Sequence, residues 1–124
     1  MQLTFKSIRL AFLGGAFGTI VRFALLFSFG ELIAVVFVNV LGAALLGWLN
    51  GNRKYDSHDF SALWKTGFAG GFTTMSGFAA LIVLYGQANA LVAVAGTLLI
   101  TAIGLGAYWL AFKQSRKNSS KNDA

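Results

Sequence analysis

Four stretches of the chain stay apolar for long enough to cross a membrane as helices. They cover approximately residues 10–29, 32–50, 64–86 and 90–112, and charged side chains are rare within them. A bilayer core of about 30 Å takes roughly 20 apolar residues in helical conformation, so each stretch can form one span. The pattern predicts an all-α integral membrane protein with four transmembrane helices.

The segments between the spans set the expected arrangement. Residues 30–31 join the first two spans, residues 87–89 join the last two, and a polar loop of residues 51–63 connects the two pairs. Short connections join antiparallel neighbours, which predicts two hairpins with both termini on one side. We expect a four-span membrane domain over residues 1–112 and a polar tail over 113–124, disordered beyond its first turn.

Composition supports the membrane assignment and excludes other classes. Hydrophobic residues make up 56% of the 124 residues and charged residues only 11%, and a soluble chain of this size could not bury so much apolar surface. The chain has no cysteine, which excludes a disulfide scaffold and a thiolate metal site. It also lacks a Ser-His-Asp constellation and a phosphate-binding loop, so we do not expect an enzyme.

Basic residues lie almost entirely on one predicted side of the membrane. Nine of the ten lysines and arginines fall in the N-terminal segment, in the middle loop up to Lys65, and in the tail, and only Arg22 lies within a span. The positive-inside rule then places both termini in the cytoplasm. Binding to nucleic acid or to anionic lipid is the less favoured explanation of the +6 net charge, because the bases flank spans instead of forming one patch.

Small residues recur four positions apart in three of the spans. Such spacing lets helices approach closely in lipid, where burial of apolar surface gives little driving force. A tightly packed bundle of only four helices has little room for an internal pathway, so we expect a dimer. The pairs are Gly14 and Gly18, Ala43 and Gly47, and Gly67 and Gly71.

A few polar side chains lie inside the spans, where they mark functional sites or helix-packing contacts. Asn39 could donate to an anion or form an interhelical hydrogen bond, and Arg22 could line a vestibule or bond to carbonyls near a helix end. Thr97 and Thr101 share one face of the fourth span, although threonines in helices often bond to their own backbone. The spans contain no carboxylate, which argues against proton-coupled transport.

The third span contains the most unusual segment, residues 67–78 (GFAGGFTTMSGF). Glycines and hydroxyl residues at its centre predict a broken helix, since irregular backbone at that depth must be buried in protein or line a cavity. A broken helix offers free carbonyls to a cation and a half-helix N-terminus to an anion. Phe72 and Phe78 flank the predicted break.

Three segments together resemble the Fluc (CrcB) family of bacterial fluoride channels: residues 14–23 (GGAFGTIVRF), 38–42 (VNVLG) and 67–78. The resemblance covers all four spans in the right order. It implies an antiparallel, inverted dimer in the cell membrane that exports fluoride passively from the cytoplasm. It also implies a structural sodium ion at the dimer centre, with the backbone oxygens of Gly70 and Thr73 as ligands. Six residues are expected along the fluoride pathway: Asn39, Phe78, Met75, Thr101, Thr97 and Arg22.

The chain departs from the family pattern in two ways. Met75 replaces the first phenylalanine of a Phe-x-x-Phe motif whose second is Phe78, and Gly77 replaces a common threonine. The strong basic bias also fixes one orientation, whereas a dual-orientation homodimer needs little bias. We therefore expect a paired homologue of opposite orientation as the second subunit, in preference to a second copy.

Two other functions stay open on the sequence alone. A small four-span multidrug transporter would need a membrane-embedded glutamate in the first span, where this chain has only Arg22. A non-conducting accessory subunit would complete a channel dimer without lining a pore. For a channel, the spans should lack fixed lysines, because conduction requires that the ion be able to leave.

Overall fold

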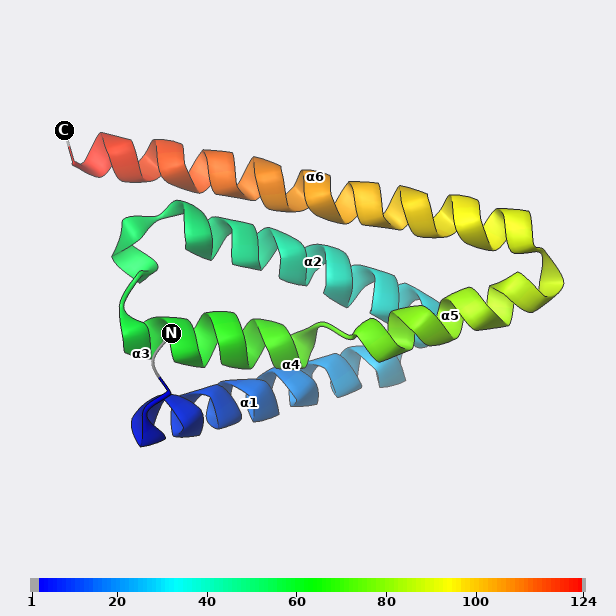
Figure 1. Ribbon diagram of the computed structural model, residues 1–124, viewed down its shortest axis with the longest axis horizontal. Helices are drawn as coiled ribbons and strands as arrows, with labels where there is room; N and C mark the ends of the chain where they lie inside the picture. Colours follow the sequence, from blue (N-terminus) through cyan, green and yellow to red (C-terminus); the bar gives the residue numbers. More distant parts are fainter. Residues whose placement is uncertain (1–2, 124) are drawn as a thin grey trace.

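The computed structural model describes residues 3–123, and these residues form helices joined by short connections, with no β-strand among them (Figure 1). A turn of 3₁₀-helix over Arg53–Tyr55 lies in the middle loop, and the segment Ser61–Ala69 is wound as π-helix. The α-helices are α1 (Phe5–Phe29), α2 (Glu31–Gly51), α3 (His58–Phe60), α4 (Gly70–Phe72), α5 (Met75–Ala88) and α6 (Ala90–Asn122).

Four helical segments are long and apolar enough to cross a membrane, which confirms the predicted number of spans. The third of them consists of a continuous helix over residues 58–72, a break at Thr73 and Thr74, and α5. The predicted break is therefore confirmed. It falls on the two threonines directly after Phe72, whereas Gly70 and Gly71 are themselves helical.

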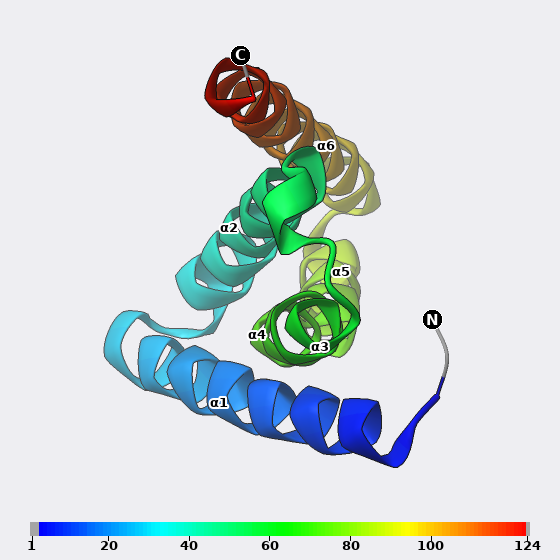
Figure 2. The same cartoon turned by 90° about the vertical axis from the view of Figure 1, so that its left-hand side faces the viewer.

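The helices are arranged around the third span. Viewed along the helices, the segment formed by α3 and α4 lies between α1 on one side and the α2–α6 pair on the other (Figure 2). The first and last described residues lie at the same end of the molecule, as does the middle loop (Figure 1). Two hairpins with neighbouring termini were expected, and the structure has this arrangement.

Glycines allow α1 to pack directly against the third span. A side chain at Gly14 would collide with the Leu63 carbonyl, and one at Gly18 would collide with the Phe68 carbonyl. From the opposite helix, a side chain at Gly71 would collide with the backbone of Gly15. The small-residue spacing predicted close helix packing, and the structure shows it at backbone-to-backbone distance.

A second close contact joins α2 to α6. A side chain at Gly47 would collide with the Tyr108 carbonyl, and one at Gly51 with the Phe112 carbonyl. The Asn50 amide also donates to the Tyr108 hydroxyl at 3.1 Å. These contacts hold the last helix of the chain along the length of the second.

The polar tail is helical, so the prediction that it is disordered beyond its first turn is wrong. α6 continues through the polar residues to Asn122, while Ala124 lies outside the described residues. The segment after Phe112 contains no glycine or proline and includes several good helix formers. Ser115 is also fully buried against Gly51, which ties the first turns of the tail to α2.

Two further helix ends differ from the expected boundaries. α1 begins at Phe5, where Thr4 forms a capping box with Ser7 through bonds of 3.2 and 3.0 Å. The third span begins at His58, so Lys65 lies two turns inside a helix. The expectation that the spans lack lysine is therefore wrong for this helix.

Replacing Gly18 by alanine should destabilise the protein, whereas replacing Gly96 should not. A Cβ at Gly18 would lie 2.8 Å from the Phe72 nitrogen, but one at Gly96 would meet nothing within 4 Å. We expect Gly18→Ala to lower the free energy of unfolding by about 1–3 kcal/mol, as overpacked sites do. Gly96→Ala should be neutral or stabilising, because alanine favours the helix. Thermal unfolding in detergent measures both, and equal effects would contradict this packing.

Candidate functional site

The break in the third span is a short extended segment between two helices. Thr73 has φ −81° and ψ 158°, and Thr74 has φ −143° and ψ 111°. The Thr74 side chain caps α5 by accepting a hydrogen bond from the Gly77 nitrogen at 3.1 Å. The chain thus ends one helix and starts another within two residues, at the depth where α1 and α2 pack on it.

Asn39 of α2 pairs with the backbone of Thr74 in both directions. Its Nδ2 donates to the Thr74 carbonyl at 3.1 Å, and its Oδ1 accepts from the Thr74 nitrogen at 2.8 Å. This two-way pairing fixes the orientation of the amide. An interhelical role was one of the two interpretations open for Asn39, and the structure shows this bond.

Two side chains of α1 bond to other carbonyls near the break. Arg22 donates from Nη1 to the Thr73 carbonyl at 3.0 Å, and the Thr19 hydroxyl donates to the Gly71 carbonyl at 3.3 Å. Thr73 caps the C-terminal end of α4, so Arg22 bonds to a carbonyl at a helix end, as one of its two interpretations had it. Carbonyls that lose their helical partner at the break are in this way satisfied by neighbouring helices.

Gly42 of α2 provides the space for the Thr73 side chain. A side chain at Gly42 would collide with Cγ2 of Thr73, and the Thr73 hydroxyl donates to the Ala69 carbonyl at 2.8 Å. Gly42 lies three residues after Asn39 and therefore on the same face of α2. One face of α2 thus leaves space for the Thr73 side chain and forms hydrogen bonds with the Thr74 backbone.

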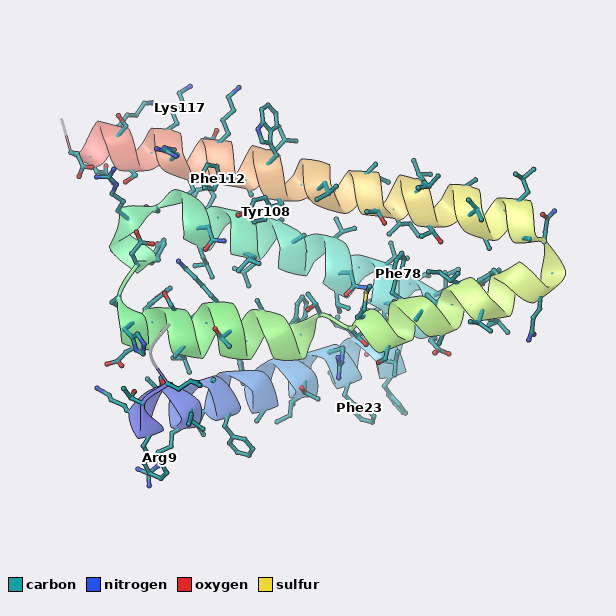
Figure 3. All side chains as sticks on the ribbon, in the orientation of Figure 1. Arg9, Phe23, Phe78, Tyr108, Phe112 and Lys117 are labelled. Carbon is teal, nitrogen blue, oxygen red and sulfur yellow. The ribbon has the colours of Figure 1, made fainter. Side chains whose placement is uncertain are left out.

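A cavity of about 420 Å³ lies beside the break, between α2, the third span and α6. Phe78 lies at the start of α5, on the side that faces α2 and α6 (Figure 3). Met75 also lines the cavity, and it is 80% exposed. The cavity brings together Thr74 of the break and six residues predicted for the ion pathway or the sodium site: Asn39, Gly70, Thr73, Met75, Phe78 and Thr101.

A second cavity, of about 250 Å³, adjoins the first at Thr74, which alone among the described residues lines both. It contains Arg22 and Thr19 from α1, Glu31 from the start of α2, and Ser76 from the first turn of α5. The N-terminal end of α5, which favours negative charge, begins where the two cavities meet. The break thus separates two partly polar spaces.

Thr97 is the one predicted pathway residue that lines neither cavity. Its hydroxyl donates to the Ala93 carbonyl of its own helix at 2.7 Å, which was the alternative interpretation of this residue. Thr101, one turn further along α6, lines the larger cavity. The two threonines share a helix face but lie one turn apart along α6. Only the three-dimensional arrangement shows that Thr101 lines the cavity and Thr97 does not.

Three residues of the site were missed by the sequence interpretation. Thr19 bonds to the break, Gly42 accommodates Thr73, and Lys65 lines the larger cavity. Helical spacing could have indicated all three. Thr19 precedes Arg22 by three residues, Gly42 follows Asn39 by three, and Lys65 precedes Thr73 by eight.

The carbonyls expected to ligate sodium fit a hard cation in chemistry. The Thr74 nitrogen, which would bond to the Gly70 carbonyl in an unbroken helix, donates to Asn39 instead. A side chain at Gly70 would meet nothing within 4 Å, so that residue lies beside open space. The Thr73 carbonyl accepts from Arg22 and keeps a second lone pair. Oxygen ligands of this kind suit hard cations.

Four spans, a helix broken within the membrane and two partly polar cavities at the break define a multi-pass membrane protein of the channel or transporter type. The chain belongs to the CrcB family, since the family model described as CrcB-like protein, Camphor Resistance (CrcB), matches residues 9–112.

Several relatives of the chain carry the name fluoride-specific ion channel FluC. FluC 1 of Corynebacterium diphtheriae is 38% identical over 79% of this chain and 85% of its own length. FluC 2 of Leifsonia xyli subsp. xyli is 38% identical over 83% of this chain and 79% of its own. FluC 2 of Corynebacterium jeikeium is 32% identical over 80% and 72%. No solved structure matches the chain.

Replacing Asn39 by leucine should destabilise the fold around the break. Leucine has a similar size but leaves the Thr74 nitrogen without its partner, and it leaves the Thr74 carbonyl with only the 3.4 Å bond from the Phe78 nitrogen. An unpaired buried group costs about 1–3 kcal/mol. Thr97→Val is the matched control, because the Thr97 hydroxyl bonds only within its own helix. Thermal unfolding in detergent should show a clear loss for Asn39→Leu and little change for Thr97→Val. A neutral Asn39→Leu would contradict the clamping role of this residue.

Proposed function

We propose that the protein is a fluoride-selective channel that exports fluoride passively from the cytoplasm. Relatives that share 30–38% identity over about four fifths of this chain are named fluoride-specific ion channels. The observation that carries the proposal is the position of Asn39, which clamps the helix break and lines the cavity beside it. The arrangement conducts an ion and makes or breaks no covalent bond.

The chemistry of the larger cavity suits a small, strongly hydrated anion. A selective pore must replace the water around such an ion with close hydrogen-bond donors. The Asn39 amide has a second hydrogen beyond the one bonded to Thr74, and the Thr101 hydroxyl lines the same space. Phe78 adds a ring whose edge is quadrupole-positive. These groups attract an anion through partial charges, so the anion can also leave.

A sodium ion bound by the Gly70 and Thr73 carbonyls is part of this proposal. The two carbonyls lie at the break, where a bound cation would neutralise their partial negative charge. Two oxygens are fewer than a hard cation prefers, so the same carbonyls of a second subunit would complete the set. The sodium ion would link the broken third spans of the two subunits.

An open surface supports a second subunit. The structure exposes 8189 Å², whereas a compact soluble monomer of this mass exposes about 6,400 Å². The most apolar part of α6 has none of its residues buried, and Met75 points outward at the edge of the cavity. Lipid and a partner of opposite orientation would share this surface.

The basic bias supports one fixed orientation and hence a paired homologue. The middle loop and both described ends of the chain lie at one end of the molecule, where nine of the ten basic residues are concentrated (Figure 1). That end would face the cytoplasm. A partner with the opposite bias would insert in the opposite orientation and supply the phenylalanine that Met75 replaces.

Fluoride efflux from liposomes tests the function. We expect flux from liposomes that contain this chain with its paired subunit, and Phe78→Leu in this chain should reduce the flux at least tenfold, because the ring edge is lost while the apolar volume remains. Phe5→Leu, at the first turn of α1 and outside both cavities, is the control. Flux from this chain alone would contradict obligate pairing. A paired channel indifferent to Phe78→Leu would indicate a non-conducting accessory subunit.

Restoring the missing ring should increase conduction. Met75 lines the cavity with Phe78 but lacks a positive ring edge. Because Met75 is 80% exposed, a phenylalanine there has room without repacking. We expect Met75→Phe to raise the initial rate of fluoride efflux about tenfold, which corresponds to about 1.4 kcal/mol at the barrier. An unchanged or lower rate would show that this position does not contribute a pore-facing ring.

A further inference from the structure

The larger cavity has one charged residue in its lining, Lys65. The other described residues that line it are apolar, amide or hydroxyl side chains and glycines. The Lys65 side chain is only 15% exposed, so most of it packs against the protein instead of extending into solvent. The one formal charge among the described lining residues is therefore positive.

Lys65 lies at the opposite end of the cavity from the break. Lys65, Ala69 and Thr73 follow one another at intervals of four residues and all line the cavity, so they share one helix face. Lys65 lies within the π-helical segment, eight residues before Thr73 at the break. The charge therefore lies between the loop side of the molecule and the polar groups around Asn39.

The counter-ion of Lys65 holds it weakly. Its ammonium lies 3.4 Å from Oδ1 of Asp56, which belongs to the middle loop and has a side chain 59% exposed. Water competes for the exposed Asp56 carboxylate, which weakens its attraction for the ammonium. Asp56 thus reduces the field of Lys65 without cancelling it, and its own carboxylate does not line the cavity.

We propose that Lys65 recruits fluoride into the cavity and that Asp56 weakens its hold so that the ion moves on toward Asn39. The inference rests on the proposed channel function and adds to it a positioning residue outside the helix break. A cation in a low-dielectric wall raises the local concentration of anions and their rate of entry. A bare lysine would also retain the anion, and conduction needs binding that is weak enough to release it.

A purely structural ion pair makes a different prediction from anion recruitment. If the pair only fastened the middle loop to the third span, removing either partner would impair the channel in the same direction. If Lys65 recruits the anion, removing its charge slows entry, while removing the Asp56 charge strengthens the field and speeds entry. The sign of the two effects therefore separates the two roles.

The test measures the initial rate of fluoride efflux from liposomes at low fluoride concentration. Liposomes contain this chain alone or with its paired subunit, and the assembly that conducts is used for the variants. Lys65→Gln should lower the rate about tenfold, Lys65→Arg should retain it, and Asp56→Asn should raise it. In the Lys65→Gln background, Asp56→Asn should have no effect, since the two act through one interaction.

Lys6→Gln is the matched control. Lys6 forms an ion pair with Asp59 at 2.7 Å at the same end of the molecule, but it lines neither cavity of the site. The Lys6→Gln substitution removes one positive charge from the same end of the molecule. An equal loss of efflux rate for Lys6→Gln and Lys65→Gln would overturn the proposal in favour of a general surface potential. A fall in rate for both Lys65→Gln and Asp56→Asn would overturn it in favour of a structural pair. No flux from either wild-type assembly would overturn the channel function itself.

Discussion

The pairing of Asn39 with Thr74 is the interaction on which the rest of the site depends. In a membrane, a broken helix leaves backbone groups that no water can satisfy, and each unsatisfied group costs several kcal/mol. Asn39 satisfies both backbone groups of Thr74, and α1 supplies Arg22 and Thr19 for two of the neighbouring carbonyls. The break persists because two other helices are built to hold it.

This clamping requires that α1 and α2 approach the third span very closely. The side chains of Arg22 and Asn39 reach the break only if their helices lie at nearly fixed distances from it, and glycines set those distances. Gly18 brings α1 against the turn that precedes the break, and Gly42 receives the Thr73 side chain. Packing, helix interruption and cavity are therefore consequences of one set of contacts, in which small residues position the polar ones.

Sequence reasoning reached those features that follow from local pattern. Apolar length indicated the four spans, and the segment around Gly70 and Gly71 indicated the break. Sequence reasoning did not predict the register of one helix against another. The rotation of each helix and its position along the membrane normal decide which polar side chain lines which cavity. Thr101 lines the cavity and Thr97 does not, and the helical tail is ordered where Ser115 packs on α2. None of these outcomes is encoded in a single segment.

In the proposed channel, the two cations at the site would make the anion pathway positive without trapping the ion. Arg22 lines the smaller cavity with its guanidinium bonded to the Thr73 carbonyl, while Lys65 lines the larger one with its ammonium near Asp56. A carbonyl dipole and an exposed carboxylate each remove part of the attraction that a bare cation would exert. In the proposed channel, an ion that moved from one cavity to the other would cross the break at Thr74, where the free amide hydrogen of Asn39 would replace formal charge as the source of attraction. The cations would then raise the rate at which the anion enters, while neutral donors would contact it during its passage.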